Sequence, residues 1–71
     1  MTETETLGAR LARLRHERGE SLRKAAPLIG CAHRHLHQLE HGPTANPTLA
    51  TLQALARHYG VTVAYLIGEA P

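Results

Sequence analysis

Histidine, arginine and glutamine side chains recur at helical spacing between residues 33 and 41. His33 and His37, and likewise His37 and His41, are four residues apart, which places each pair one turn apart on the same face of a helix. Paired imidazoles of this kind can ligate Zn²⁺, Ni²⁺ or Cu²⁺. The sequence provides no assured third ligand, however, so we expect neither a metal nor a cofactor.

The same segment separates polar from apolar side chains when it is wound as a helix. At about 100° per residue, the polar side chains fall within roughly 140° of one another and the leucines fall on the opposite side. The polar side consists of His33, Arg34, His37 and Gln38, and the apolar side of Leu36 and Leu39. Such a stripe is either a solvated helix face or a surface that hydrogen-bonds to a ligand.

The chain is short and poor in aromatic residues. It has 71 residues, with no Phe or Trp and two Tyr, so it holds one domain with a modest core. Leu, Ile, Val and Ala must build that core, which favours an all-α fold of closely packed helices. An enzyme is not expected, because no Ser/His/Asp or Cys/His set is suitably placed and so small a domain offers no deep pocket.

Basic residues are concentrated in the first half of the domain. Residues 7–42 contain seven Lys or Arg and three Glu, whereas residues 1–6 and 43–71 contribute −2 and zero to the formal net charge of +2. This asymmetry is typical of a polyanion-binding face, although a solvated arginine-rich surface gives the same counts. Cys31 is the single cysteine, and no secretory or membrane segment is recognisable, so we expect a soluble cytoplasmic protein.

Hydrophobic periodicity and capping residues predict five short helices in a domain over residues 7–68, after a flexible tail over 1–6. The third helix should cover about 32–41. The first helix should begin near Thr6, and the candidate N-caps of later helices are Ser21, Asn46 or Thr48, and Thr62. The candidate C-terminal stops are Gly19, Gly30, Gly42 and Gly60, with Gly42 in a left-handed conformation.

Apolar residues at helical spacing indicate which faces are buried. The first helix should bury Leu7, Leu11 and Leu14. The fourth should bury Leu49, Leu52, Leu55 and Ala56. Pro27 should kink the second helix or fall within its first turns, because proline removes a backbone donor.

The segment from residue 22 to 41 has the spacing of two crossed helices. Ala26 supplies a small residue at the closest approach, and Gly30 supplies the positive-φ residue of the turn. Ile29 and Cys31 should flank the turn as small apolar plugs.

These features together resemble the phage-repressor and Cro-type helix-turn-helix family. The matching stretches are Leu-Arg-His-Glu-Arg-Gly (14–19), the turn around Ala26 and Gly30, Leu-Glu-His-Gly (39–42), Asn-Pro-Thr-Leu (46–49) and Tyr-Gly-Val-Thr-Val-Ala-Tyr-Leu (59–66). The resemblance covers about residues 7–67. It implies a lambda-repressor-like fold of five helices that binds operator DNA as a dimer, with the third helix in the major groove. Leu22 departs from the family where a glutamine often touches phosphate, and Pro27 interrupts the second helix.

The resemblance implies that the side chains of the polar stripe contact DNA. His33, Arg34, His37 and Gln38 would contact base edges, with arginine suited to guanine and glutamine to adenine, each pairing worth about 1–3 kcal/mol of discrimination. The expected phosphate contacts are Arg10, Arg23, Lys24, His41, Thr44 and Asn46. Imidazoles near phosphates would also make DNA affinity rise as the pH falls through about 6–7.

The family often joins an arginine late in the first helix to a glutamate late in the third. Arg15 and Glu40 occupy these positions, and Glu40 lies beside the apolar face, where an unpaired carboxylate is costly. We expect a partly buried ion pair with a structural role. The alternative is that Glu40 reaches solvent and Arg15 reaches a phosphate.

Dimerisation is expected because one helix buries too little surface for high specificity. The candidate interface residues are Val63, Tyr65, Leu66 and Ile67; alternatively, Val63 and Leu66 complete the monomer core. The expected function is that of a sequence-specific transcriptional regulator, in particular a repressor on the nucleoid. The rival is an antitoxin or another protein-interaction module whose main partner is a toxin or regulatory protein. No membrane and no small-molecule effector is expected.

Overall fold

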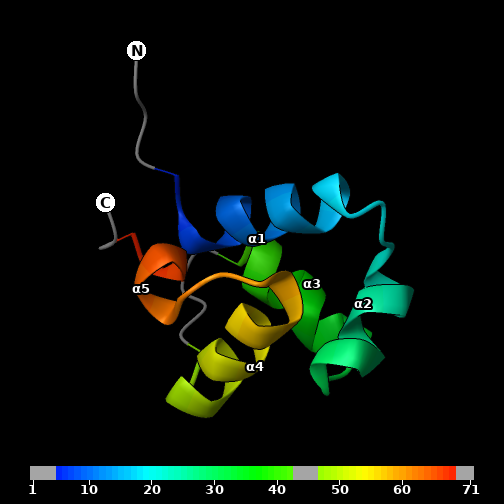
Figure 1. Ribbon diagram of the computed structural model, residues 1–71. Helices are drawn as coiled ribbons and strands as arrows, with labels where there is room; N and C mark the ends of the chain where they lie inside the picture. The colour runs from blue at the N-terminus through cyan, green and yellow to red at the C-terminus, as the bar shows by residue number, and fades with distance from the viewer. Residues whose placement is uncertain (1–4, 43–46, 69–71) are drawn as a thin grey trace.

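The computed structural model describes residues 5–42 and 47–68, and over these residues it contains five helices and no strand (Figure 1). The helices are α1 (Leu7–Glu17), α2 (Leu22–Ile29), α3 (His33–His41), α4 (Leu49–Tyr59) and α5 (Val63–Leu66). The predicted all-α class and five-helix architecture are therefore confirmed for the described ranges. None of these helices has the length and apolar content needed to span a membrane.

Hydroxyl side chains begin four of the five described helices. Thr6, Ser21, Thr48 and Thr62 each accept a hydrogen bond from the backbone N–H three residues later, an interaction worth about 1 kcal/mol. Of the two candidate caps for α4, Thr48 is the one used, and Asn46 lies outside the described residues. Ala32 precedes α3 and provides no side-chain cap.

Glycines end α2 and α4 in the left-handed region. Gly30 and Gly60 have φ values of 100° and 69°, which glycine adopts at little cost because it lacks Cβ. The prediction of a left-handed Gly42 is wrong, because this residue is extended, with φ −78° and ψ 129°. Gly42 precedes Pro43, and a residue before proline is restricted to extended conformations.

Pro27 is the sixth residue of α2 and so lies in its second turn. The helix begins at Leu22 and continues through Pro27 to Ile29. Pro27 is exposed, so water can hydrogen-bond to the Arg23 carbonyl that loses its helical donor.

One apolar core joins the helices. Leu11, Leu36, Leu55 and Leu66 are fully buried and come from α1, α3, α4 and α5, and α2 contributes Ala25, Ala26 and Ile29. Helix α1 packs on α3 and α5, α2 packs on α3 and α4, and α4 packs on α5 (Figure 1).

Two predicted core positions are wrong. Leu49 is 62% exposed, because α4 packs through Leu55, Ala56 and Tyr59 in its C-terminal half and its first turn extends beyond the core. Cys31 is half-buried rather than a buried plug, although its burial is sufficient to raise the pKa of the thiol.

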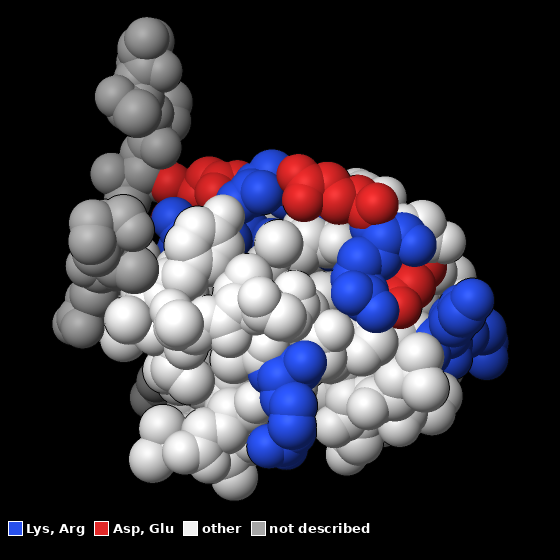
Figure 2. Space-filling view, in the orientation of Figure 1, with Lys and Arg blue, Asp and Glu red and all other residues white. Residues whose placement is uncertain are grey.

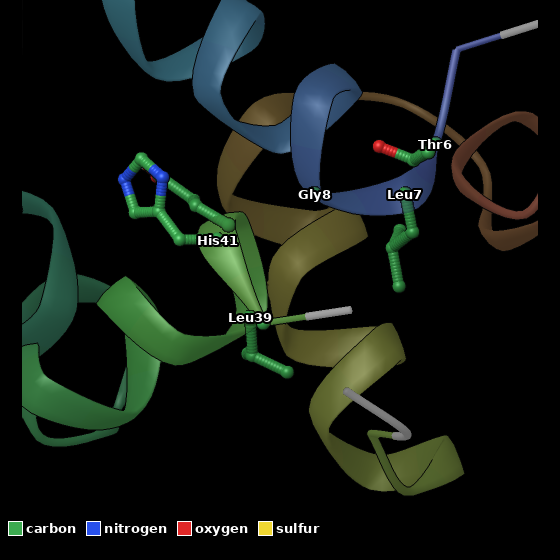
Figure 3. A pocket seen from close by; sticks show the side chains of 7 residues that line it. Thr6, Leu7, Gly8, Leu39 and His41 are labelled. Atoms are coloured by element: carbon green, nitrogen blue, oxygen red, sulfur yellow. The ribbon is translucent and has the colours of Figure 1, made fainter. Parts of the chain in front are cut away.

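The backbone of α3 lies directly against α1 at Gly8. A Cβ atom there would collide with the backbone carbonyl of Glu40 and would lie 2.8 Å from the carbonyl oxygen of Leu39. Glycine inside a helix costs about 1 kcal/mol relative to alanine, so this close approach explains its presence. A cavity of about 270 Å³ adjoins Gly8, between the start of α1 and the end of α3. Figure 3 shows Leu7 and Leu39 beside this cavity, with the ring of His41 turned away from both.

Candidate nucleic-acid interface

The exposed side of α3 brings the predicted base-contacting residues together. His33, Arg34, His37 and Gln38 are all exposed, whereas Leu36 and Leu39, at 0% and 3% exposure, hold the opposite side against the core. We call these four polar side chains the α3 stripe. No ion pair recorded within residues 5–42 and 47–68 involves them, so their polar atoms face solvent.

The turn between α2 and α3 determines where this stripe points. The backbone N–H groups of Gly30 and Cys31 both donate to the carbonyl of Ala26, at 2.8 and 3.0 Å. Ala25 and Ala26 have no exposed surface, and their small side chains let α2 lie close to α3.

The Arg15–Glu40 pair fixes α3 to α1 from the inner side. Arg15 Nε donates to Glu40 Oε2 at 2.7 Å and Arg15 Nη2 donates to Glu40 Oε1 at 2.9 Å. The Glu40 side chain is completely buried, and the hydrogen bonds from the guanidinium raise the pKa of Arg15. Arg15 Nη1 also donates to the carbonyl oxygen of Glu20 at 2.9 Å. This arginine is therefore held inside the fold and does not face a phosphate.

A second buried carboxylate was not anticipated from the sequence. Glu20 lies between α1 and α2, and its Oε1 is 2.9 Å from Nε2 of His58 at the end of α4. The two side chains are 6% and 9% exposed. The hydrogen bond with His58, assisted by Arg18, lowers the pKa of Glu20. We call Arg15, Glu20, Glu40 and His58 the internal charge network.

The other arginines of α1 are also engaged within the fold. Arg10 donates to the carbonyl of Leu66 at 2.9 Å and lies over the ring of Tyr65, and its side chain is only 12% exposed. With its guanidinium held in this way, Arg10 is not placed to reach a phosphate, contrary to the expectation from the sequence. Arg13 pairs with Glu5 and with Glu17. The predicted flexible tail covered residues 1–6. Glu5 and Thr6 are among the residues that the structure describes, and residues 1–4 are not.

Acidic and basic side chains consequently alternate along the α1 edge of the molecule, as Figure 2 shows. The cations of the described ranges for which no ion pair is recorded are Arg23, Lys24, Arg34 and Arg57, and all four are exposed. Three of them belong to α2 and α3. Most of the basic side chains without a recorded partner therefore lie on the two crossed helices, and not over the whole first half of the domain. His41 is exposed at the end of α3, and Thr44 and Asn46 lie outside the described residues.

The α5 residues divide between core and surface. Leu66 is fully buried in the monomer core, so its side chain is not available to a second copy and its assignment to an interface is wrong. Val63 and Tyr65 pack partly against the core, and Tyr65 Oη accepts a hydrogen bond from Arg13 at 2.6 Å. Ile67 is 46% exposed.

Two crossed helices joined by a glycine turn, with a polar stripe on the outer side of the second, define a helix-turn-helix domain. The family model described as a helix-turn-helix domain matches residues 6–66. The chain belongs to this family, which confirms the resemblance found in the sequence.

Several regulators are similar to this chain over part of their length. The HTH-type transcriptional regulator DdrOP3 of Deinococcus deserti is 48% identical over 54 residues, which are 76% of this chain and 41% of that protein. An HTH-type transcriptional regulator of Coxiella burnetii is 43% identical over 42 residues, 59% of this chain and 19% of that protein. PuuR of Escherichia coli is 34% identical over 62 residues, 87% of this chain and 33% of that protein. The chain thus spans less than half the length of each of these relatives.

Proposed function

We propose that this chain binds duplex DNA at specific sequences and regulates transcription. The observation that carries the proposal is the α3 stripe, which holds four exposed side chains able to hydrogen-bond on the outer side of the second crossed helix. A helix of this kind fits the major groove. Arg34 would read guanine and Gln38 adenine, with His33 and His37 beside them. The relatives named as transcriptional regulators support this assignment.

The cations of α2 and α3 that have no ion-pair partner within residues 5–42 and 47–68 would bind the phosphates. Arg23 and Lys24 lie in the first turns of α2, and both side chains are exposed. Contacts of this type position a protein on DNA without reading its sequence. His41 completes the proposed set at the other end of α3, and Thr44 and Asn46 remain proposals from the sequence.

We assign the face over α4 and α5 to a second copy of the chain. Helices α4 and α5 together contain one Lys or Arg and no Asp or Glu, and Figure 2 shows few charged side chains on this face. Leu49, at the start of α4, and Ile67, after α5, are exposed, and Val63 and Tyr65 of α5 are partly exposed. Depletion of charge around apolar residues is typical of interface cores. A dimer would place two α3 stripes about 34 Å apart on one side of DNA. Bound to a promoter on the nucleoid, the dimer would repress transcription.

Selection of bound sites from a random duplex pool tests the proposal. We expect a short palindrome, because two symmetry-related stripes read two half-sites. Arg34→Ala and Gln38→Ala should each relax the preference at one position per half-site, by about 1–3 kcal/mol. Arg18→Ala is the matched control, because Arg18 is an exposed arginine outside α3 and outside the face assigned to the second copy, and it should leave the selected sequence unchanged. Uniform weakening at every sequence in the Arg34 and Gln38 variants would show that the stripe does not read bases.

A further inference from the structure

His37 and His41 lie one turn apart on α3, and their rings lie together. The ring centroids are 4.4 Å apart and the ring planes are inclined by 42°. Both residues are exposed, and the His41 side chain is 57% accessible. Two histidines four residues apart on a helix can present their ring nitrogens to one metal ion.

The separation of the rings is close to that expected for two imidazoles on one metal ion. Imidazole nitrogens lie about 2.1 Å from a bound first-row ion. Two rings that meet such an ion at a right angle have centroids about 4.5 Å apart, whereas a tetrahedral angle separates them by about 5 Å. The observed 4.4 Å is compatible with one shared ion, and among the first-row divalent ions such nitrogen ligands bind Cu²⁺ most tightly.

No neighbouring carboxylate of the described residues is available as a third ligand, so water would fill the other coordination positions of the metal ion. Glu40 Oε1 lies 4.0 Å from His41 Nε2, but both carboxylate oxygens of Glu40 accept hydrogen bonds from Arg15 and the side chain is completely buried. No group of three or more ligand residues that could hold a metal occurs in the described ranges. The site is thus an open one with two protein ligands.

We propose that His37 and His41 form a two-imidazole site for Cu²⁺ or Ni²⁺. Each ring donates one nitrogen lone pair and displaces one water from the hydrated ion, and no electron is transferred. Because His37 also belongs to the α3 stripe, a bound ion would compete with specific DNA; this consequence rests on the proposed function.

Calorimetric titration of the metal-free chain with CuCl₂ and NiCl₂, in the absence of DNA, tests the site. We expect tighter binding of Cu²⁺ than of Ni²⁺, with two histidine nitrogens on Cu²⁺ in its paramagnetic resonance spectrum. His41→Ala and His37→Ala should each weaken binding by more than about tenfold, because a chelate becomes a single ligand.

His33→Ala is the matched control, because His33 is also exposed and four residues from His37 but has no recorded ring contact with it. It should leave the affinity for Cu²⁺ unchanged. Equal losses in the His33 and His41 variants, or full affinity in the His37 variant, would overturn the site.

Repeating the CuCl₂ titration with the selected palindromic duplex tests the competition. The apparent affinity for Cu²⁺ should fall as the duplex occupies the protein, since coupling between two ligands is reciprocal. An unchanged affinity for Cu²⁺ on the duplex-bound protein would refute competition. Failure of the proposed function is detected separately, as failure of the metal-free chain to select any sequence.

Discussion

The internal charge network and the α3 stripe contain similar side chains in opposite environments. Arg15 is 8% exposed and is bonded to both the Glu40 carboxylate and a backbone carbonyl, whereas Arg34 is exposed and is in no recorded ion pair of the described residues. Charge counted along the sequence does not distinguish these roles. An arginine becomes available to an outside anion only when the fold leaves it unpaired.

Removing one member of the network should have the largest effect on stability. Glu40→Ala leaves the Arg15 guanidinium buried without its partner carboxylate, so the free energy of unfolding should fall by about 3–5 kcal/mol. Urea denaturation measures this loss. Glu17→Ala breaks only the exposed pair with Arg13 and should cost no more than about 1 kcal/mol. Equal losses in the two variants would remove the distinction between internal and surface charge.

Gly8→Ala should force α1 and α3 apart and lower the stability of the protein. The new methyl group would meet the backbone of α3, and backbone shifts of this kind cost about 1–3 kcal/mol, which outweighs the gain of about 1 kcal/mol in helix propensity. Thermal and urea unfolding should both show a less stable protein. Ala9→Gly at an exposed neighbouring position reports the propensity alone, and a Gly8→Ala protein that is more stable than the parent would contradict the close approach.

The Glu20–His58 contact predicts a loss of stability in acid. The folded state lowers the pKa of Glu20 from its usual 4.5, so its contribution is fully present above that value and is lost as the pH falls through the lower folded pKa. Urea midpoints between pH 6 and pH 3 should therefore decline less steeply in Glu20→Gln than in the parent. Glu5→Gln removes a carboxylate on the surface whose pKa is also lowered, and it should retain the Glu20 part of the decline. Parallel curves for Glu20→Gln and the parent would show that the contact does not stabilise the fold.

We expect a smaller loss of stability at alkaline pH, caused by ionisation of Tyr59. Burial raises its pKa from 10.0 to about 12, so the neutral phenol contributes stability that is present below about pH 10 and is lost as the pH rises toward 12. Tyr59→Phe should flatten this alkaline decline. It should not destabilise the protein at pH 7, because Tyr59 Oη is buried with no hydrogen-bond partner among the described residues. Tyr65→Phe is the control, since Tyr65 Oη accepts from Arg13, and its loss should be visible at pH 7.

Local features of the fold were predictable because they depend on neighbouring residues. The caps at Ser21 and Thr62, the turn at Gly30 and the opposed faces of α3 each arise within one or two helical turns. The errors at Leu49 and Leu66 have a different origin. Whether an apolar side chain is buried depends on where the neighbouring helices end, and helical periodicity alone does not contain that information.

The amino-acid sequence by itself determined the helices and the polar stripe, since both follow from the regular 3.6-residue period of the backbone. Only the tertiary structure decided which charges are paired, because Glu20 and His58 are 38 residues apart and no local pattern connects them. The pairing of Arg15 with Glu40, which are 25 residues apart, was predicted only because the family resemblance implied it. The cations on α2 and α3 that have no partner in the described part of the chain are those that remain after the fold has brought these distant partners together.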